Sequence, residues 1–500
     1  MKKFLFPLLF LGFITVLLIG CRRDTTIEIK AHSPKIWPDY SGVTLPFNIA
    51  PPNFYIIEPH QKYKIRIFGS VEEDTIFLKG KNLVEIPIKA WKKLLSKNKN
   101  KNIYFSISLK TDRKWHSYQP IINLVKSEKL DPFLVYRLIE PSYQMCNYLI
   151  TEERNLENYQ RRSLFDNTLT NKSCVNCHTF SQNNPNYLVY HVRFFHSGTY
   201  ILRNGKYQRL NLNSDRFAQG GVYPAWHPSG NFIAFATGKA IPFVHAKDIE
   251  RRTEVFDSLG DIMLYDLEKN VVISDSRMAH SDYEETFPTW SPDGKYLYFC
   301  QSKTPNRDSN EDFTSYSKKI KYDLVRIAFN AQTSTFGSIE TLISHTNTKQ
   351  TVSFPRISPN GKYLVFCLSD HGTFPIRHPE SDLYILNLKT LVYRKMEAIN
   401  SPKTESYHTF SSNGHWMVFS SKRGDGMYAR PYFTYIDKHG KSSKPFLLPE
   451  KDPNFYVLSL KSFNVPELVK GSVNTSAIKS QMACEQEIIY PQAIKVQGEK

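Results

Sequence analysis

The chain has 500 residues and a formal net charge of +18, from 65 Lys and Arg against 47 Asp and Glu. This length is enough for two or three domains with a real hydrophobic core. The Lys residues are scattered among Asn and Ile and form no Arg-rich helix or basic motif. We therefore interpret the charge as a solvated surface and predict no nucleic-acid partner.

Residues 1–21 predict export from the cytoplasm. A basic start is followed by an apolar run that ends directly before Cys21, which is typical of a signal peptide. The alternative is a plain transmembrane anchor, but the run is only about 17 residues against the roughly 20 that a span needs. Leu18-Ile19-Gly20-Cys21 resembles a bacterial lipobox, which implies a lipidated Cys21 as a membrane anchor. We expect a periplasm-facing protein, with the inner leaflet of the outer membrane favoured.

Residues 22–130 predict a tether followed by a small β-domain. The first part, to about residue 60, is punctuated by proline. Short β-rich runs and one helix, Ala90–Ser96, come next, and together they suggest an immunoglobulin-like β-sandwich. The expected strands are Tyr63–Gly69, Thr75–Leu78, Leu83–Ile88, Ile103–Leu109 and Ile121–Val125. We find no chemistry here and expect a spacer or docking role.

Residues 131–185 read as a connecting segment that contains Cys174-Val175-Asn176-Cys177-His178. Two thiols three residues apart, followed by an imidazole, are the arrangement that captures one haem c covalently, with His178 as the proximal iron ligand. A dithiol redox motif is an alternative, but it would lie in a βαβ pattern. A zinc site is another, but it would need a second ligand pair nearby.

An electron-carrying haem usually has a second axial ligand. The candidates near the motif are His191, which follows His178 by 13 residues, and Met145. Met427 and His245 are possible in space. The alternative for His191 is a packed strand residue, and for Met145 it is simple core packing.

Residues 186–468 contain a repeat of strand, Pro-x-Gly turn and strand. Four copies begin at Tyr223, Phe287, Phe354 and Tyr407, and further strand pairs follow each copy. Four strands per repeat at this period predict propeller blades. Five blades can be counted, and strands near 456–460, joined by N-terminal ones, would close a sixth. Residues 469–500 predict a C-terminal tail.

The Trp290-Ser291-Pro292-Asp293-Gly294 pattern resembles the β-propeller repeats of TolB-like proteins. With the haem motif directly ahead, the chain is similar to bacterial lipoproteins that combine a TolB-like propeller with a c-type haem site. The resemblance implies an all-β fold and a partner-docking surface. It does not carry over the Tol role, because the N-terminal part differs from the α/β domain of TolB.

Two further sets of residues carry expectations. Cys300 and Cys367 end apolar strands and are expected to be small buried hydrophobes. Acidic and imidazole groups ahead of the blade turns suggest a polar site at the channel mouth. Its candidates are Glu284, Glu285, Glu405 and His408. The alternative is that these groups cap strands and bridge adjacent blades.

The first functional hypothesis is electron transfer, with the propeller as the platform on which a protein partner docks. The second is a binding or scaffold propeller whose haem is structural or sensory, and the third is a haem peroxidase. The chain has no Gly-x-Ser-x-Gly hydrolase motif, and no catalytic residue is predicted.

Overall fold

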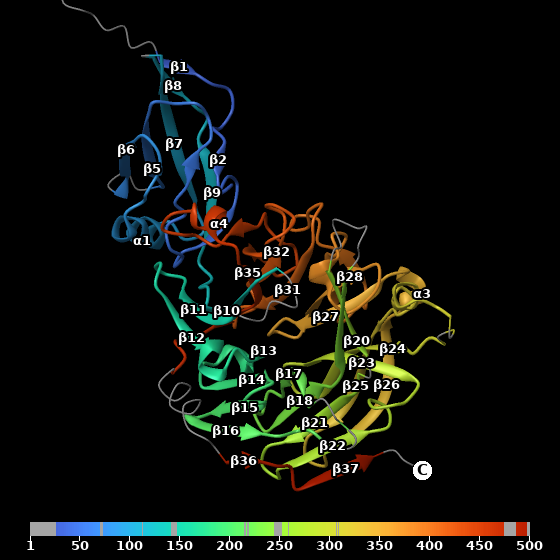
Figure 1. The fold of residues 1–500 in the computed structure, drawn as a ribbon. Coiled ribbons are helices and arrows are strands. Elements are labelled where there is room, and N and C mark those ends of the chain that lie inside the picture. The colour runs from blue at the N-terminus through green and yellow to red at the C-terminus, as the bar shows by residue number, and fades with distance from the viewer. Residues whose placement is uncertain are drawn as a thin grey trace, which may run out of the picture.

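The computed structural model describes residues 27–497, apart from 71–73, 113, 142–147, 215–216, 218–219, 245–252, 259, 307, 309 and 475–486. Cys21, Met145 and His245 lie outside the described residues. The fold is all-β: a small N-terminal domain stands on the rim of a six-bladed β-propeller (Figure 1). Within the described ranges, every helix is too short or too polar to cross a lipid bilayer.

The N-terminal domain is built on one seven-stranded sheet. Its elements are β1 (Ile27–Ile29), β2 (Ile36–Trp37), β3 (Thr44–Pro46), β4 (Tyr55–Ile56), β5 (Lys62–Phe68), β6 (Ile76–Gly80), α1 (Ile88–Lys97), β7 (Asn102–Thr111), β8 (Lys114–Ser117) and β9 (Ile121–Lys126). β2 and β4 form a separate pair. The immunoglobulin-like sandwich is not confirmed, and the strand expected at Leu83–Ile88 is reduced to a single bridge at Val84.

The predicted helix is confirmed as α1. It forms because Trp91, Leu94 and Leu95 recur at helical spacing and are all buried. Trp91 also donates a hydrogen bond from Nε1 to the carbonyl of Ile49 at 3.0 Å. The helix is therefore held against the irregular segment that leads into the sheet.

Six four-stranded antiparallel blades surround the propeller axis. The strands of each blade are given from the innermost outward. Blade 1 consists of β13 (Cys174–Phe180), β14 (Tyr187–Arg193), β15 (Gly198–Arg203) and β16 (Lys206–Leu210), and blade 2 of β17 (Val222–Trp226), β18 (Phe232–Ala236), β21 (Ile262–Asp266) and β22 (Val271–Asp275). Blade 3 consists of β23 (Tyr283–Trp290), β24 (Tyr296–Lys303), β25 (Asp323–Asn330) and β26 (Thr335–Ile343), blade 4 of β27 (Thr351–Ile357), β28 (Tyr363–Ser369), β29 (Asp382–Asn387) and β30 (Tyr393–Lys395), and blade 5 of β31 (Glu405–Phe410), β32 (Trp416–Ser421), β33 (Arg430–Tyr435) and β34 (Phe446–Leu447). Short helices α2 (Phe313–Ser317), α3 (His345–Thr348) and α4 (Phe455–Leu458) lie in connections.

Blade 6 closes the ring with strands from both ends of the propeller sequence. Its innermost strand is β35 (Ser462–Val469), and β10 (Phe133–Ile139), β11 (Ile150–Asn155) and β12 (Arg161–Asp166) follow outward. The propeller therefore begins at β10 rather than at residue 186. The segment 131–185, expected to be a connection, supplies three strands of blade 6 and the inner strand of blade 1.

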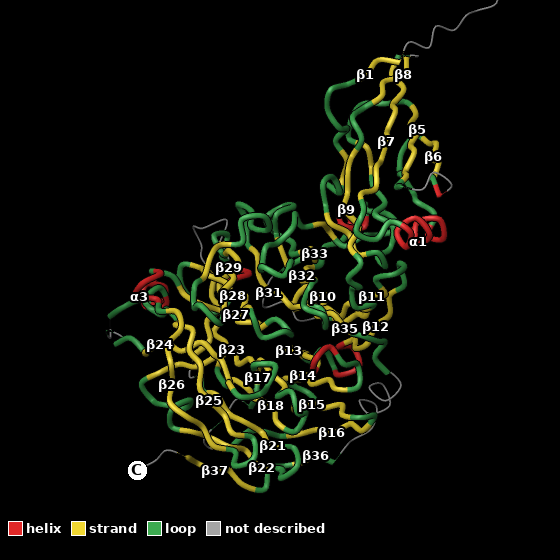
Figure 2. The backbone as a smooth tube through the Cα atoms, turned by 180° about the vertical axis from the view of Figure 1, so that it is seen from behind, coloured by secondary structure: helices red, strands yellow, loops and turns green. Residues whose placement is uncertain are grey.

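The C-terminal tail also pairs with the propeller. β36 (Ile488–Ile489) extends blade 1 beside β16, and β37 (Ala493–Gln497) extends blade 2 beside β22, both in parallel. These strands run along the lower rim in Figure 1 and are seen from behind in Figure 2. The tail covers the outer edges of two blades, which would otherwise present unpaired strand groups.

The predicted turns are confirmed in blades 2 to 5. Gly230, Gly294, Gly361 and Gly414 all have φ between +69° and +73°, a conformation that side chains other than glycine seldom adopt. In blade 3 the Gly294 amide donates to the carbonyl of Ser291 at 2.9 Å and closes the turn.

A β-bulge recurs at the same place in all six innermost strands, and one residue there has a positive φ. These residues are Cys177, Tyr223, Phe287, Phe354, Tyr407 and Val465, with φ between +47° and +56°. Register shifts in the strand pairing mark each bulge. A bulge changes the direction in which side chains point. The ring centroids of Phe287 in blade 3 and Phe354 in blade 4 lie 4.0 Å apart. The second Cys of the Cys174-Val175-Asn176-Cys177-His178 motif thus occupies the bulge position of blade 1.

Two further features connect parts of the fold that are distant in sequence. One hydrophobic core joins the N-terminal domain to blades 5 and 6, and it includes Trp416 with Trp91. Blade 2 carries an inserted hairpin, β19 (Lys239–Val244) and β20 (Thr253–Ser258). This hairpin reaches the loop after β28, where Thr373 Oγ1 accepts a hydrogen bond from the amide of Asp257 at 3.4 Å.

Candidate functional site

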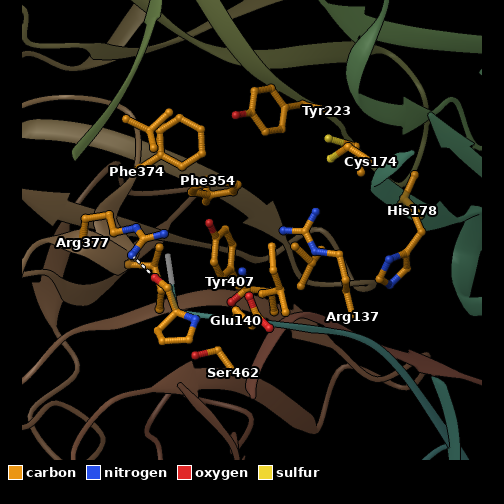
Figure 3. Close-up of a pocket in the computed structure, with 18 of the residues that line it drawn as sticks. Arg137, Glu140, Cys174, His178, Tyr223, Phe354, Phe374, Arg377, Tyr407 and Ser462 are labelled. Atoms are coloured by element: carbon orange, nitrogen blue, oxygen red, sulfur yellow. Dashed lines mark hydrogen bonds between the residues drawn. The ribbon is translucent and has the colours of Figure 1, made fainter. Parts of the chain in front are cut away.

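A pocket lies where the innermost strands meet (Figure 3). Five of the six bulge residues line it: Cys177, Tyr223, Phe354, Tyr407 and Val465. The pocket is also lined by Arg137 from β10, by Phe374, Arg377 and Met427 from connections between strands, and by Val255 from the inserted hairpin. The cavity volume is about 80 Å³, so side chains fill most of the space.

Cys174, Cys177 and His178 all line this pocket. In a regular strand, neighbours such as Cys177 and His178 would point to opposite faces. The bulge between Asn176 and Thr179 interrupts the pairing of β13 with β14 and changes that alternation. As a result, the three residues of the motif line one pocket from a strand.

His178 is a neutral, buried imidazole. Its exposure is 6%, and Nε2 has no hydrogen-bond partner among the described residues. Burial, aided by the nearby Arg137 guanidinium, lowers the pKa of His178 to about 3. Metal ions bind the neutral form of histidine. A buried, unpartnered nitrogen is also costly unless a ligand completes it.

The Cys177 thiol is unsuited to redox exchange. Burial raises the pKa of the Cys177 thiol, whereas reactive cysteines have a lowered pKa and a stable thiolate. Cys177 is not in a disulfide. Cys300 and Cys367 are also buried thiols outside any disulfide, which confirms their expected role as small buried hydrophobes.

The pocket is rich in cationic side chains. Arg137 is buried, and its Nε and Nη1 have no hydrogen-bond partner among the described residues. Arg356 and Arg377 also line the wall, and burial lowers the pKa of both groups. Burial and the charge of Arg377 lower the pKa of Lys422 to about 7. One carboxylate, Glu140, also lines the pocket and pairs with Lys461 at 3.2 Å, so the cations are in excess and favour an acidic ligand.

Aromatic rings form another part of the wall. The centroids of Phe354 and Tyr407 are 4.9 Å apart, and those of Tyr223 and Phe354 are 6.0 Å apart. The hydroxyl of Tyr223 donates to Asp257 at 3.0 Å. The pocket therefore combines flat apolar surfaces with cations, which suits a ligand that has both an apolar body and acidic groups.

Of the candidates for a second axial ligand, Met427 lines the pocket. Its side chain is 54% exposed, so it stands at the opening. His191 does not line the pocket: it lies on β14, is buried, and its Nδ1 is 3.2 Å from Thr199 Oγ1.

None of the predicted channel-mouth residues lines this pocket. Glu285 Oε1 accepts from Gln301 at 2.9 Å, within blade 3. Glu405 pairs with Arg423 at 3.0 Å, within blade 5. His408 Nε2 is 2.8 Å from the carbonyl of Val365, in the neighbouring blade. Glu284 accepts from the amide of Gly260 at 2.6 Å, in the neighbouring blade 2.

Sequence reasoning missed the cations of the pocket. One signal was available: Arg137 interrupts the apolar strand Phe133–Ile139, and a charged residue inside a buried strand commonly has a functional reason. Arg377 and Lys422 lie in polar loops and gave no such signal.

Comparisons with known proteins extend to the fold alone. No family model matches the chain, and no curated protein does. Among solved structures, an oligogalacturonate lyase in complex with manganese is 11% identical, over 63% of this chain and 72% of that one, at a TM-score of 0.36. The oligogalacturonate lyase of Vibrio parahaemolyticus is 12% identical, over 59% and 85%, at 0.33. Hydrazine synthase of Kuenenia stuttgartiensis is 13% identical, over 52% and 76%, at 0.29.

Proposed function

We propose that this propeller scaffold carries one c-type haem, bound covalently through Cys174 and Cys177 with His178 as an iron ligand, and that it transfers electrons. The observation that carries the proposal is that Cys174, Cys177 and the neutral imidazole of His178, whose Nε2 has no hydrogen-bond partner among the described residues, line one pocket. When bound there, haem supplies a one-electron iron couple.

Three properties of the residues support the fit. The donor set is two thiols and one imidazole, which is what covalent haem attachment needs. The rings of Tyr223, Phe354 and Tyr407 offer apolar contact to a flat macrocycle. Arg137 and its cationic neighbours would bind the acidic side chains of haem.

The size of the pocket adds a condition. Its volume of about 80 Å³ is below the roughly 300–1,000 Å³ of cofactor and ligand sites. A haem would therefore require the lining side chains to move outward. Met427 stands on an exposed loop at the opening, and it is the side chain of this wall that could both move and offer a second ligand.

The same pocket supports a second candidate, a haem peroxidase or sensor, if the second axial position stays open. Met427 is more than half exposed, so its ligation would depend on the position of its loop. Iron with two axial protein ligands favours electron transfer, whereas an open position favours peroxide or ligand binding.

The test is covalent haem in the full chain, matured in a bacterial strain that attaches c-type haem. Haem stain should remain on the denatured wild-type chain and on Cys300→Ser, and it should be lost from Cys174→Ser/Cys177→Ser. A folded wild-type chain without stain would refute the proposal. A six-coordinate low-spin spectrum would support the carrier, and a high-spin spectrum the second candidate.

We further propose that lipidated Cys21 anchors the protein to the membrane on the periplasmic side and that its redox partner docks on the propeller. The lipobox-like sequence before Cys21 supports the anchor. Cys21→Ser should release the chain from the membrane fraction and abolish incorporation of labelled fatty acid. Retention of both in this variant would refute lipidation.

A further inference from the structure

A second cluster of ligand-type side chains lies beside the pocket but outside it. Glu254 on β20 meets His371 and His378, which lie on the loop between β28 and β29. All three side chains are buried, with exposures of 1%, 5% and 0%. The cluster thus joins the inserted hairpin of blade 2 to a loop of blade 4, two segments more than 110 residues apart.

The geometry is close to that of a metal site with three protein ligands. Glu254 Oε1 is 3.2 Å from His378 Nε2, and Glu254 Oε2 is 3.9 Å from His371 Nε2. One ligand atom from each residue lies within 4.8 Å of the other two. In a tetrahedral zinc site with metal–ligand bonds of about 2.0–2.1 Å, the ligand atoms lie about 3.4 Å from one another. The distances between the three ligand atoms would therefore have to shorten by about 1.5 Å or less to coordinate an ion.

The surroundings of His378 match those of a ligating histidine. Its Nε2 faces the cluster, and its Nδ1 is 3.0 Å from Glu380 Oε1. Metal-bound histidines characteristically donate their other ring N–H to a carboxylate, which fixes the ring and raises its basicity. The two imidazole rings are 4.7 Å apart and nearly perpendicular, so both can point a nitrogen at one ion.

We propose that Glu254, His371 and His378 form a binding site for a divalent transition-metal ion, with zinc as the best-matched probe. Two imidazoles and one carboxylate are a known zinc donor set that leaves a fourth position for water. In the part of the chain that the structure describes, no other group of His, Cys, Asp and Glu side chains has this spacing.

The place of the site in the fold indicates what the ion would do. Glu254 and Val255 are neighbours on β20, so their side chains point to opposite faces of the strand. Val255 lines the central pocket, and Glu254 therefore faces away from it. An ion at this cluster would clamp the hairpin to the loop that carries Phe374 and Arg377, and it would fix one wall of the pocket from outside.

A charged cluster without metal is the competing explanation. A protonated His378 between Glu254 and Glu380 would also form buried ion pairs. The two explanations differ in a measurable way, because an ion-pair cluster has no stoichiometric affinity for zinc and gains no stability from it.

The experiment measures zinc binding by the full chain after chelator treatment and dialysis. The wild type, the exposed-histidine control His280→Gln and the double variant Cys174→Ser/Cys177→Ser should each bind one zinc ion. Glu254→Gln, His371→Gln and His378→Gln should lose at least tenfold in affinity. Glu380→Gln should lose 10- to 100-fold while keeping all three ligands.

Two measurements on the wild type keep the test valid if a variant fails to fold. Zinc should raise the urea midpoint of the wild type. Cobalt(II) bound in place of zinc should show tetrahedral visible bands without the near-ultraviolet thiolate band. Absence of stoichiometric binding, a thiolate band, or loss of zinc from the cysteine variant with retention in His371→Gln would overturn the proposal. The haem stain is independent of all these outcomes.

Discussion

Glu285 on β23 provides a quantitative test of how the propeller interior treats charge. Its side chain is fully buried, and Oε2 has no hydrogen-bond partner among the described residues. Burial, reinforced by the nearby Asp261 and Glu284, raises the pKa of Glu285 to about 8. The folded protein therefore prefers the protonated acid. The substitution Glu285→Gln tests this preference, because glutamine is neutral and has the same shape.

The direction and magnitude of the change in stability with pH follow from proton linkage. A carboxyl whose folded pKa lies above its unfolded value of 4.5 binds more protons in the folded state, so stability falls as pH rises through that window. Each pH unit is worth about 1.36 kcal/mol, which gives a cost of about 3 kcal/mol at pH 7. Above pH 8 the cost levels off at about 5 kcal/mol, an upper limit if water enters the site.

Glu285→Gln should remove this cost. We expect unchanged stability at pH 4, and a gain that grows to several kcal/mol at pH 9, in urea unfolding followed by far-ultraviolet circular dichroism. The control is Glu397→Gln, an exposed carboxyl that should show no such trend. A variant that is less stable than the wild type at pH 9 would refute the reasoning and would favour a bound cation at Glu285.

Three further outcomes can be checked. If Met427 is the second axial ligand, Met427→Ala should convert a low-spin haem spectrum to high-spin while His191→Ala leaves it low-spin; the reverse would contradict the pocket assignment. Trp416→Ala should lower the unfolding free energy by about 3–5 kcal/mol, because Trp416 is fully buried in the core shared by the domain and blades 5 and 6; a loss below 1 kcal/mol would show that this core is not shared. Cys300 and Cys367 should resist maleimide until urea unfolds the chain, since burial raises the pKa of both thiols; rapid labelling of the native protein would contradict their burial.

The propeller could be predicted from sequence because its turns repeat. Trp290-Ser291-Pro292-Asp293-Gly294 encodes a local turn, and local geometry is readable without knowledge of distant contacts. Three strands of blade 1 were predicted between Tyr187 and Leu210, but its innermost strand was missed because Ser181-Gln182-Asn183 replaces the Pro-x-Gly turn. Yet His178-Thr179-Phe180-Ser181 repeats His408-Thr409-Phe410-Ser411 of blade 5 letter for letter. That match was the available signal that the Cys-x-x-Cys-His motif itself lies on an inner strand.

Only part of the candidate site could be predicted from the sequence. The chemistry of Cys174, Cys177 and His178 follows from residue type and spacing. Their neighbours do not, because Arg137 comes from blade 6 and Met427 from blade 5. Such residues meet only through ring closure, which depends on the pairing of β10 with β35 across more than 300 residues. No local periodicity encodes that pairing.

Closure of the propeller ring by β35 also determines when the pocket can form after synthesis begins. Residues 462–469 are synthesised long after residue 178, so blade 6 lacks its inner strand during that interval. If haem is attached as proposed, the motif would be accessible to it during this interval. Once the ring closes, the cavity of about 80 Å³ would admit a macrocycle only after the lining side chains move outward. Loading of the pocket would thus be easier before closure than after it, and free haem added to folded, empty protein should bind more slowly than haem supplied during synthesis.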